Sequence, residues 1–222
     1  MEYNKEKRKK RKEPIEQPDD CSEVLLHACC APCSSAIVEW LIHHGVRPTI
    51  FYFNPNIYPA SEYETRKNES KRHAESLGIE WIDADYDHQQ WLDSVRGHEN
   101  DPERGSRCQL CFHLRLLETA RQAKRLGIKY FATTLASSRW KSLEQIAIAG
   151  TTAADAVTSD DQPVVFWSQN WRKGGLQERR NQLLHEYDFY NQLYCGCEFS
   201  MRSACPTSEE TALSRADNDI RS

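Results

Sequence analysis

The chain has 222 residues, a length that suits one sizeable domain or a domain with tails. Its formal net charge of −4 gives no overall attraction for nucleic acid, so any such contact has to be local. No apolar stretch is long enough to span a bilayer, and the basic N-terminus is not followed by the apolar segment of a signal peptide. We therefore expect a cytoplasmic protein without membrane contact, whose nine cysteines serve metal or redox chemistry rather than a disulfide framework.

Two polar segments flank a central region, residues 21–205, that we expect to form a single α/β catalytic domain. Residues 1–20 carry the basic run Lys5–Lys12 and are interpreted as a disordered tail. The alternative is an arm that attracts the phosphates of RNA. Residues 206–222 are polar, lack aromatic residues and are expected to form a second loose tail.

The central region alternates apolar strands with helices, which predicts right-handed crossovers and a doubly wound, mostly parallel five-stranded sheet. Ser34 or Ser35 is expected to cap the first helix, and Ser61 with Glu64 to form a capping box. Glycines follow the second helix and the longest helix as stop signals. The expected strands are 24–28, 49–53, 79–83, 130–135 and 164–167, and the expected helices are 34–41, 61–77, 89–95, 107–126, 143–156 and 176–193.

The first strand runs directly into three cysteines, Cys29, Cys30 and Cys33. Val24–Leu26 begins an uninterrupted apolar run, as in buried parallel strands, and Ala31-Pro32 ends it. Ligands of open α/β sheets bind beyond the carboxyl ends of the strands. The pattern therefore places these cysteines in an active site.

Cys108 and Cys111 lie three residues apart at the start of the longest helix, so their side chains share one face. The positive end of that helix favours thiolates and an anionic cluster. Together with two thiols from the end of the first strand they provide four soft ligands for zinc or for an iron–sulfur cluster. Because adjacent side chains of an extended strand diverge, the pair Cys29-Cys30 favours a cluster over a single zinc ion.

Cys195-Gly196-Cys197 differs from the other cysteine groups, because a disulfide across one residue closes a very small, strained ring. Such a bridge is easily reduced and suits a redox-active disulfide. The alternatives are a further pair of metal ligands or two inert thiols. Cys21 and Cys205 flank the core and are expected to take no part.

Six motifs in order, covering Leu25 to Ser200, resemble the cobalamin-independent epoxyqueuosine reductases of the QueH family. One such motif would be weak, whereas six in order are highly specific. The motifs are His27–Cys33, Phe51–Ile57 with Glu62-Tyr63 and Arg66, Arg107–Phe112 with Arg115-Leu116, Phe131–Leu135, Arg172–Gly174, and Tyr194–Ser200.

The resemblance implies a sheet of the adenine-nucleotide α-hydrolase-like (HUP) type. It also implies a four-iron four-sulfur cluster on Cys29, Cys30, Cys108 and Cys111, and a redox-active disulfide between Cys195 and Cys197. The implied reaction reduces the epoxide of epoxyqueuosine in the tRNA anticodon loop, the last step of queuosine formation, with an unidentified electron donor. Cys33 is the candidate ligand of a second, mononuclear iron.

The proton donor is open among His27, Tyr52 and Glu62.

Two other functions compete with the reductase. A tRNA thiolase or sulfonucleotide reductase needs a glycine-serine phosphate loop after the first strand, where this chain has Ala28–Cys33. A zinc-binding RNA module without catalysis would use the same cysteines as structural ligands. An exposed tryptophan could stack on a base, and the turn Arg172–Gly175 could contact phosphate.

Overall fold

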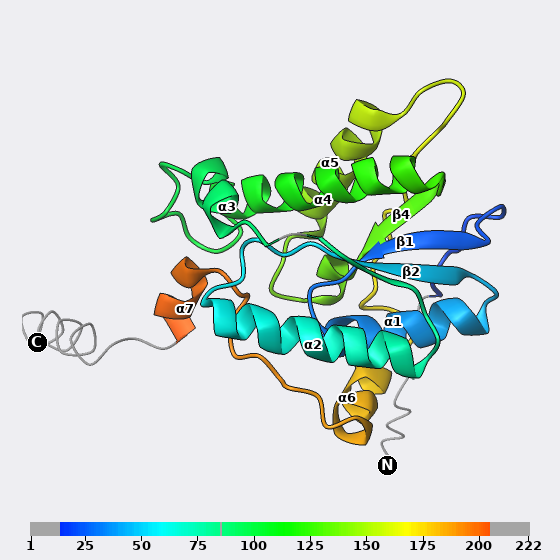
Figure 1. The fold of residues 1–222 in the computed structure, drawn as a ribbon, viewed down its shortest axis with the longest axis horizontal. Helices are drawn as coiled ribbons and strands as arrows, with labels where there is room; N and C mark the ends of the chain where they lie inside the picture. The colour runs from blue at the N-terminus through cyan, green and yellow to red at the C-terminus, as the bar shows by residue number, and fades with distance from the viewer. Residues whose placement is uncertain (1–13, 85, 205–222) are drawn as a thin grey trace, which may run out of the picture.

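The computed structural model describes residues 14–84 and 86–204 (Figure 1). The basic run Lys5–Lys12, Cys205 and the polar C-terminal segment lie outside these residues, so the two tails stay predictions. Residues 14–20, which the sequence placed in the first tail, contact the domain. Ile15 packs against the hydrophobic core, and Tyr130 donates a hydrogen bond to Asp20 (2.5 Å).

A parallel sheet of five strands forms the centre of the molecule, in the order β3-β2-β1-β4-β5. This confirms the predicted α/β fold with a doubly wound sheet. The order reverses between β1 and β4, because the chain first proceeds outward through β2 and β3 and then returns to the other side of β1. The strands are β1 (Glu23–His27), β2 (Arg47–Tyr52), β3 (Trp81–Asp83), β4 (Tyr130–Thr133) and β5 (Val165–Phe166).

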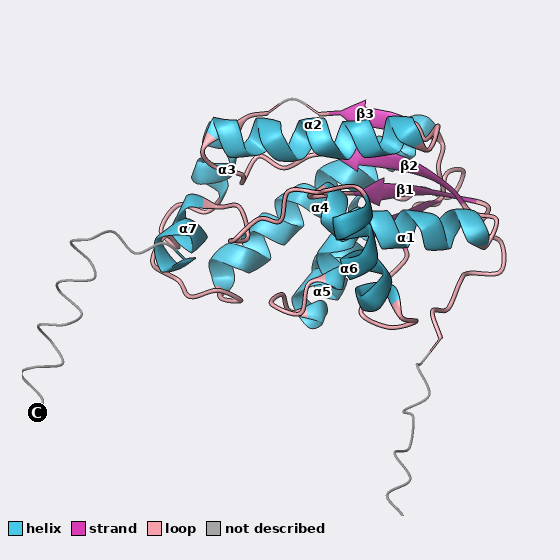
Figure 2. Ribbon diagram, turned by 90° about the horizontal axis from the view of Figure 1, so that it is seen from below, coloured by secondary structure: helices cyan, strands magenta, loops and turns pink. Residues whose placement is uncertain are grey.

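Helices cover both faces of the sheet. One face carries α1 (Ala31–His43), with α2 (Ala60–Ser76) and α6 (Leu176–Glu186) packed beside it, and Figure 2 shows α1 between these two. The other face carries the tightly packed pair α4 (Ser106–Leu126) and α5 (Leu143–Val157). No helix in the described part of the chain is long and apolar enough to cross a bilayer. Shorter elements are α3 (His88–Ser94), the 3₁₀ turn η1 (Thr134–Ser137) and α7 (Glu198–Ala204).

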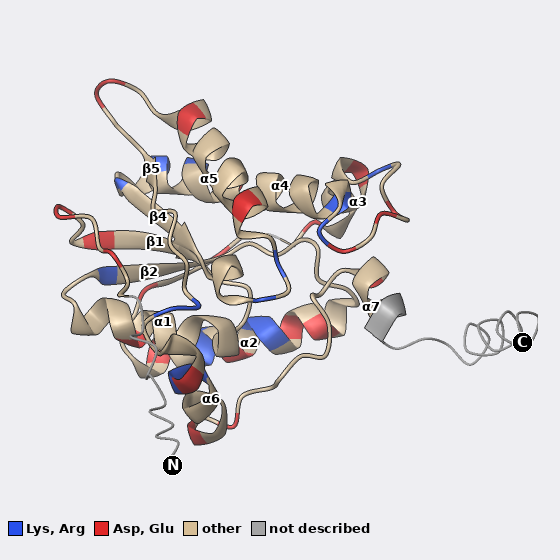
Figure 3. Cartoon of the chain, turned by 180° about the vertical axis from the view of Figure 1, so that it is seen from behind, with Lys and Arg blue, Asp and Glu red and all other residues tan. Residues whose placement is uncertain are grey.

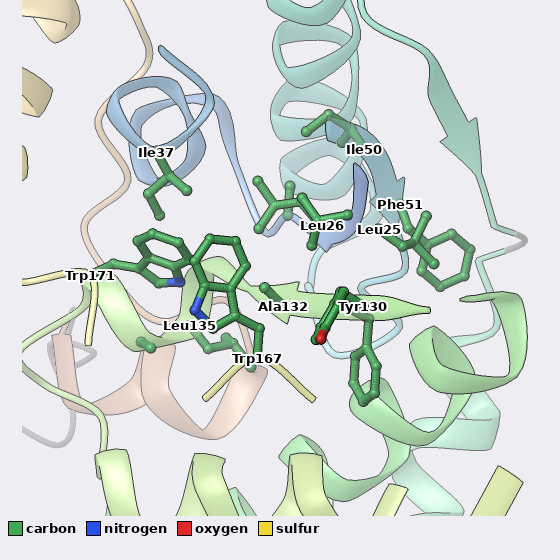
Figure 4. Packing of buried hydrophobic residues seen from close by; sticks show 14 of the residues in the cluster. Leu25, Leu26, Ile37, Ile50, Phe51, Tyr130, Ala132, Leu135, Trp167 and Trp171 are labelled. Atoms are coloured by element: carbon green, nitrogen blue, oxygen red, sulfur yellow. The ribbon is translucent and has the colours of Figure 1, made fainter. Parts of the chain in front are cut away.

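The core lies where the apolar strand β1 meets α1 (Figure 4). Leu25 and Leu26 are both fully buried, as expected for a central strand covered on two faces. Trp167 and Trp171 pack edge to face, with their ring centroids 5.3 Å apart. Apolar side chains therefore cover both faces of β1, the strand that precedes the cysteines.

Two helix starts differ from the prediction. Cys30, not Ser34 or Ser35, is the N-cap of α1, and no side chain caps that helix. Pro32 explains the early start, because proline fits the first turn of a helix. Ser34 Oγ instead donates to the carbonyl of Cys30 (3.1 Å). The predicted capping box of Ser61 is also wrong, since α2 begins at Ala60 after Pro59 without a side-chain cap.

The helix ends agree with the prediction at α4 but not at α6. α4 ends as predicted, with Gly127 in the left-handed conformation (φ 72°). The helix predicted to reach Leu193 ends at Glu186, and Asp188 takes a positive φ of 50° that a continuing helix does not allow. The chain then runs along α2, where Tyr190 donates from its backbone N–H to Glu69 and from its hydroxyl to Glu62, and a further short helix, α7, follows the last cysteine pair.

Candidate active site

The neighbouring strands β1 and β4 end side by side where the strand order reverses, which is the ligand site of open α/β sheets. Cys29 follows β1 and Thr134 follows β4. The Cys29 backbone N–H donates to Thr134 Oγ1 (3.3 Å), and this hydroxyl donates in turn to Cys29 Sγ (3.6 Å). The first cysteine group therefore lies at the switch point, as the strand–turn–helix pattern predicts.

Cys29, Cys30 and Cys33 form a thiol triad, whose Sγ atoms all lie within 4.8 Å of one another. Cys29 Sγ and Cys30 Sγ are 3.8 Å apart. The prediction that these adjacent side chains diverge is wrong, because β1 ends at His27 and the two cysteines lie in the turn into α1. Three thiols this close suit a single soft metal ion, so the adjacent pair by itself does not favour a cluster over zinc.

The thiol triad shares its protons unequally. Hydrogen bonds from Cys30 and Cys33 lower the pKa of Cys29 well below the ordinary thiol value. The hydrogen bond with Cys29 conversely raises the pKa of Cys30, and it raises that of Cys33 to about 11. The three thiols therefore titrate together and not independently, and a metal bound by all three thiolates has to displace protons.

Cys108 and Cys111 lie in the first turns of α4, on the face predicted from their spacing. Cys108 Sγ accepts a hydrogen bond from the backbone N–H of Arg104 (3.3 Å). Burial raises the pKa of both thiols, that of Cys108 to about 11. These two side chains therefore become metal ligands only by losing a proton to the solvent.

Arg115 connects the two groups of thiols. Its buried guanidinium donates from Nη2 to Asn54 Oδ1 (2.5 Å) and from Nη1 to Cys111 Sγ (3.9 Å). Its positive charge also favours the thiolate of Cys29. A buried cation between the strand and the helix offsets the negative charge that a thiolate-bound metal centre would carry.

Of the three residues considered as proton donors, His27 and Glu62 are held by neighbouring side chains, whereas the buried hydroxyl of Tyr52 has no hydrogen-bond partner among the described residues. His27 is fully buried with Nδ1 2.8 Å from Thr133 Oγ1, and burial together with the charge of Arg115 lowers its pKa to about 3. Burial raises the pKa of Tyr52 well above its ordinary value. Glu62 is held in an ion pair on α2. The environment of His27 fits a neutral structural histidine.

Cys195 and Cys197 form the third cysteine group, and Cys197 packs in the same buried cluster as Cys111 of α4. Cys195 and Cys197 are both free thiols in this structure. Cys195 is half-buried, and its charge raises the pKa of Cys108 and Cys111. Cys197 is buried, which raises its pKa to about 12. The loop therefore offers one accessible and one protected thiol beside the cysteines of α4.

A buried arginine on α2 holds this loop. Arg66 donates from Nη1 to the carbonyl of Cys195 and from Nη2 to that of Tyr194, both at 3.3 Å, and from Nε to Glu62 (2.8 Å). Gly196 has a φ of +126°, and a Cβ there would lie 3.2 Å from Nη1 of Arg66. Only glycine lets the loop approach the guanidinium this closely.

Two further residues reach the thiols from loops distant in sequence, and neither was predicted. Gln192 Nε2 donates to Cys30 Sγ (3.2 Å) and lies 3.8 Å from Cys33 Sγ. Lys141 is half-buried, and its desolvation lowers the pKa of its ammonium, yet the charges of Cys195, Cys29 and Cys33 raise that pKa above the ordinary value. Neither residue belongs to a motif, so only the fold brings them to the site.

Comparison with known proteins assigns the chain to a family. The family model described as "Epoxyqueuosine reductase QueH" matches residues 24–203, which include all three cysteine groups. A relative of that name from Haemophilus influenzae is 42% identical over 206 residues, or 93% of this chain and 82% of the relative. Relatives of that name from Acinetobacter baylyi and Histophilus somni are 43% and 45% identical over 188 residues, which is 85% of this chain and 84% and 76% of the relatives. The chain belongs to the QueH family of epoxyqueuosine reductases.

Proposed function

We propose that this chain is an epoxyqueuosine reductase, which converts epoxyqueuosine at the wobble position of tRNA to queuosine. Its family membership supports this function. The structural observation that carries the proposal is the thiol triad at the carboxyl edge of a parallel sheet, to which the buried Arg115 links Cys111 of α4. A site of this composition suits electron transfer to a bound substrate.

The reaction sets a clear requirement. Reduction of an epoxide to an alkene releases the oxygen as water and consumes two electrons and two protons. Oxidation of two thiols to a disulfide supplies two electrons and two protons, so one dithiol balances one turnover. We assign this role to Cys195 and Cys197, whose single intervening residue makes the ring strained and easily reduced again. Cys195 is the more exposed thiol and the position open to an external reductant.

We assign a four-iron four-sulfur cluster to Cys29, Cys30, Cys108 and Cys111. The donor set fits this group, because all four residues offer soft sulfur ligands and Arg115 provides a buried positive charge between them. When bound, the cluster supplies electrons one at a time. Cys33 remains for a second, mononuclear iron, a Lewis acid that suits polarisation of the epoxide carbon–oxygen bond.

The proposal also defines the partners. The substrate is a tRNA that carries epoxyqueuosine in its anticodon loop, and an electron donor has to return two electrons to the enzyme in each turnover. Because the substrate is a tRNA, we place the reaction in the cytoplasm.

A zinc-binding RNA module without catalysis is the second candidate. One observation favours it, since the thiol triad has the spacing of ligands on a single ion. The third candidate, an ATP-using tRNA thiolase or sulfonucleotide reductase, lacks such support. The turn after β1 contains no glycine for a phosphate loop, and the family assignment differs.

Anaerobic purification followed by iron, sulfide and zinc analysis tests the proposal. We expect a brown protein with nearly equal amounts of iron and acid-labile sulfide, which reduces epoxyqueuosine in tRNA when electrons are supplied. A colourless protein that holds only zinc after anaerobic reconstitution, and has no reductase activity, would support the RNA module instead.

Cys195→Ser separates the thiol pair from the metal ligands. We expect the variant to keep its iron and sulfide, because Cys195 is not among the assigned ligands, but to form less than one product per enzyme when a thiol reductant is the electron source, because the dithiol that supplies the electron pair is lost. Product formed per enzyme, measured by nucleoside analysis of the tRNA, gives the answer. Turnover at the wild-type rate would make the pair structural.

A further inference from the structure

Trp140 is the most exposed tryptophan in the described chain, with 69% of its surface accessible to solvent. A single exposed apolar side chain needs no explanation by itself, so its surroundings decide what it does. It lies in the loop between η1 and α5, next to Arg139, whose guanidinium carbon is 5.8 Å from the ring centroid. The other tryptophans are buried or packed against the core: Trp40, Trp81, Trp91, Trp167 and Trp171.

Two arginines from other parts of the chain hold this loop in place. Arg104 donates from Nε to the carbonyl of Trp140 and from Nη2 to that of Arg139, both at 2.9 Å. Arg172 donates from Nη2 to the carbonyl of Lys141 (2.7 Å) and to that of Ser138. An aromatic side chain presented on a fixed backbone loses little entropy when it binds a ligand.

Four cationic side chains lie on this loop or bond to it: Arg104, Arg139, Lys141 and Arg172. Among the described residues, no ion pair joins Arg104, Arg139, Lys141 or Arg172 to an acidic side chain, whereas Arg121, Arg125 and Arg179 all pair with glutamates. Arg104 lies near enough to Arg172 to lower the pKa of its guanidinium further, in addition to the effect of burial. Figure 3 shows basic segments on the loops between α5 on one side and α1 and α6 on the other.

This charged loop is next to the thiols. The backbone N–H of Arg104 donates to Cys108 Sγ, and the ammonium of Lys141 interacts electrostatically with Cys195, Cys29 and Cys33. Trp140 therefore stands one residue from a side chain that faces the cysteines. A molecule that contacted its indole ring would extend over the site proposed for reduction.

We propose that Trp140 is a stacking platform for an unpaired base of the RNA substrate, and that Arg104, Arg139 and Arg172 contact the phosphates beside that base. The inference rests on the proposed function, and it adds the surface that grips the RNA. Aromatic rings flanked by cations are the usual contact for single-stranded loops, whose bases can be splayed out. Exposed Glu103 and Glu144 adjoin the surface in sequence, but four cations outnumber them, and local attraction is possible despite the net charge of −4.

Binding of epoxyqueuosine-containing tRNA to the anaerobically purified holoprotein tests this surface. Loss of one stacked base predicts an affinity about 5- to 150-fold weaker for Trp140→Ala, and Trp140→Phe should retain most of it. Leu126→Ala is the matched control, because Leu126 is also exposed but lies at the far end of α4, and its affinity should not change. Arg139→Gln should reduce the slope of log affinity against log salt by about 0.7. Iron content confirms that each variant is intact.

The outcomes separate the surface from the function. Wild-type protein that does not bind this tRNA would remove the proposed function together with its substrate. Wild-type binding that is unchanged in both Trp140→Ala and Arg139→Gln would overturn the surface proposal and leave the function in place. A Trp140→Ala variant that binds tRNA normally but accepts electrons poorly would assign the surface to the electron donor instead.

Discussion

Cys108→Ser is expected to remove the iron and sulfide from the purified protein and to abolish turnover. Cys108 is one of only two thiols that α4 brings to the site, and serine offers a hard hydroxyl that binds iron poorly. The remaining thiols would keep at most a single ion at the thiol triad, which is complete without α4. Metal analysis and the visible spectrum check the first expectation, and product formation per enzyme checks the second.

Cys21→Ser is the matched control for this change. Cys21 is also a buried free cysteine, but it precedes β1 and therefore lies at the amino edge of the sheet, opposite the site. We expect wild-type iron content and activity, with a modest loss of stability because a hydroxyl replaces a buried thiol. A Cys108→Ser variant that is fully active without a cluster would end the proposed mechanism.

The sequence was sufficient for the architecture because its strong signals are local. An apolar run before a cysteine turn predicted β1, and a glycine in the left-handed region ends α4 where expected, at Gly127. The alternation of strands and helices then left few topologies, and the switch point followed from the strand order. Cap positions were less predictable, because Pro32 and Pro59 started helices before the serines considered as caps.

The sequence predicted the cysteines of the site but not the other residues that contact them. The spacing of the cysteines was enough to predict them as site residues. Gln192 and Lys141 are single polar residues in loops whose positions depend on the whole fold, so the sequence held no signal for them. The divergence expected for Cys29 and Cys30 failed because β1 ends at His27, so neither cysteine lies in the strand. The sequence predicted that an exposed tryptophan could stack on a base. Only the structure identifies it as Trp140, because only the structure shows that the other tryptophans are buried or packed against the core.

Arg66→Met is expected to lower the free energy of unfolding by about 3–5 kcal/mol, the usual consequence of breaking a buried ion pair from one side. The guanidinium is almost completely buried and lies 2.6 Å from Glu62, which also accepts a hydrogen bond from Tyr190 (2.8 Å). Methionine fills much of the volume but leaves the carboxylate and the carbonyls of Tyr194 and Cys195 without their donor. Urea unfolding followed by fluorescence provides the measurement.

Arg121→Met is the control, since it breaks an exposed pair with Glu118 on α4 and should cost about 1 kcal/mol or less.

Arg66→Met should also change the reactivity of the two thiols, which Arg121→Met should not. Without the guanidinium, the Cys195 carbonyl loses its hydrogen bond to α2, so maleimide should modify Cys195 and Cys197 faster than in the wild type under conditions where both proteins are folded. Arg66→Lys keeps the charge and should restore part of the stability but less of the thiol protection, because an ammonium cannot span both carbonyls as the planar fork does. Unfolding and thiol reactivity like those of Arg121→Met would show that the loop is held by its apolar contacts instead.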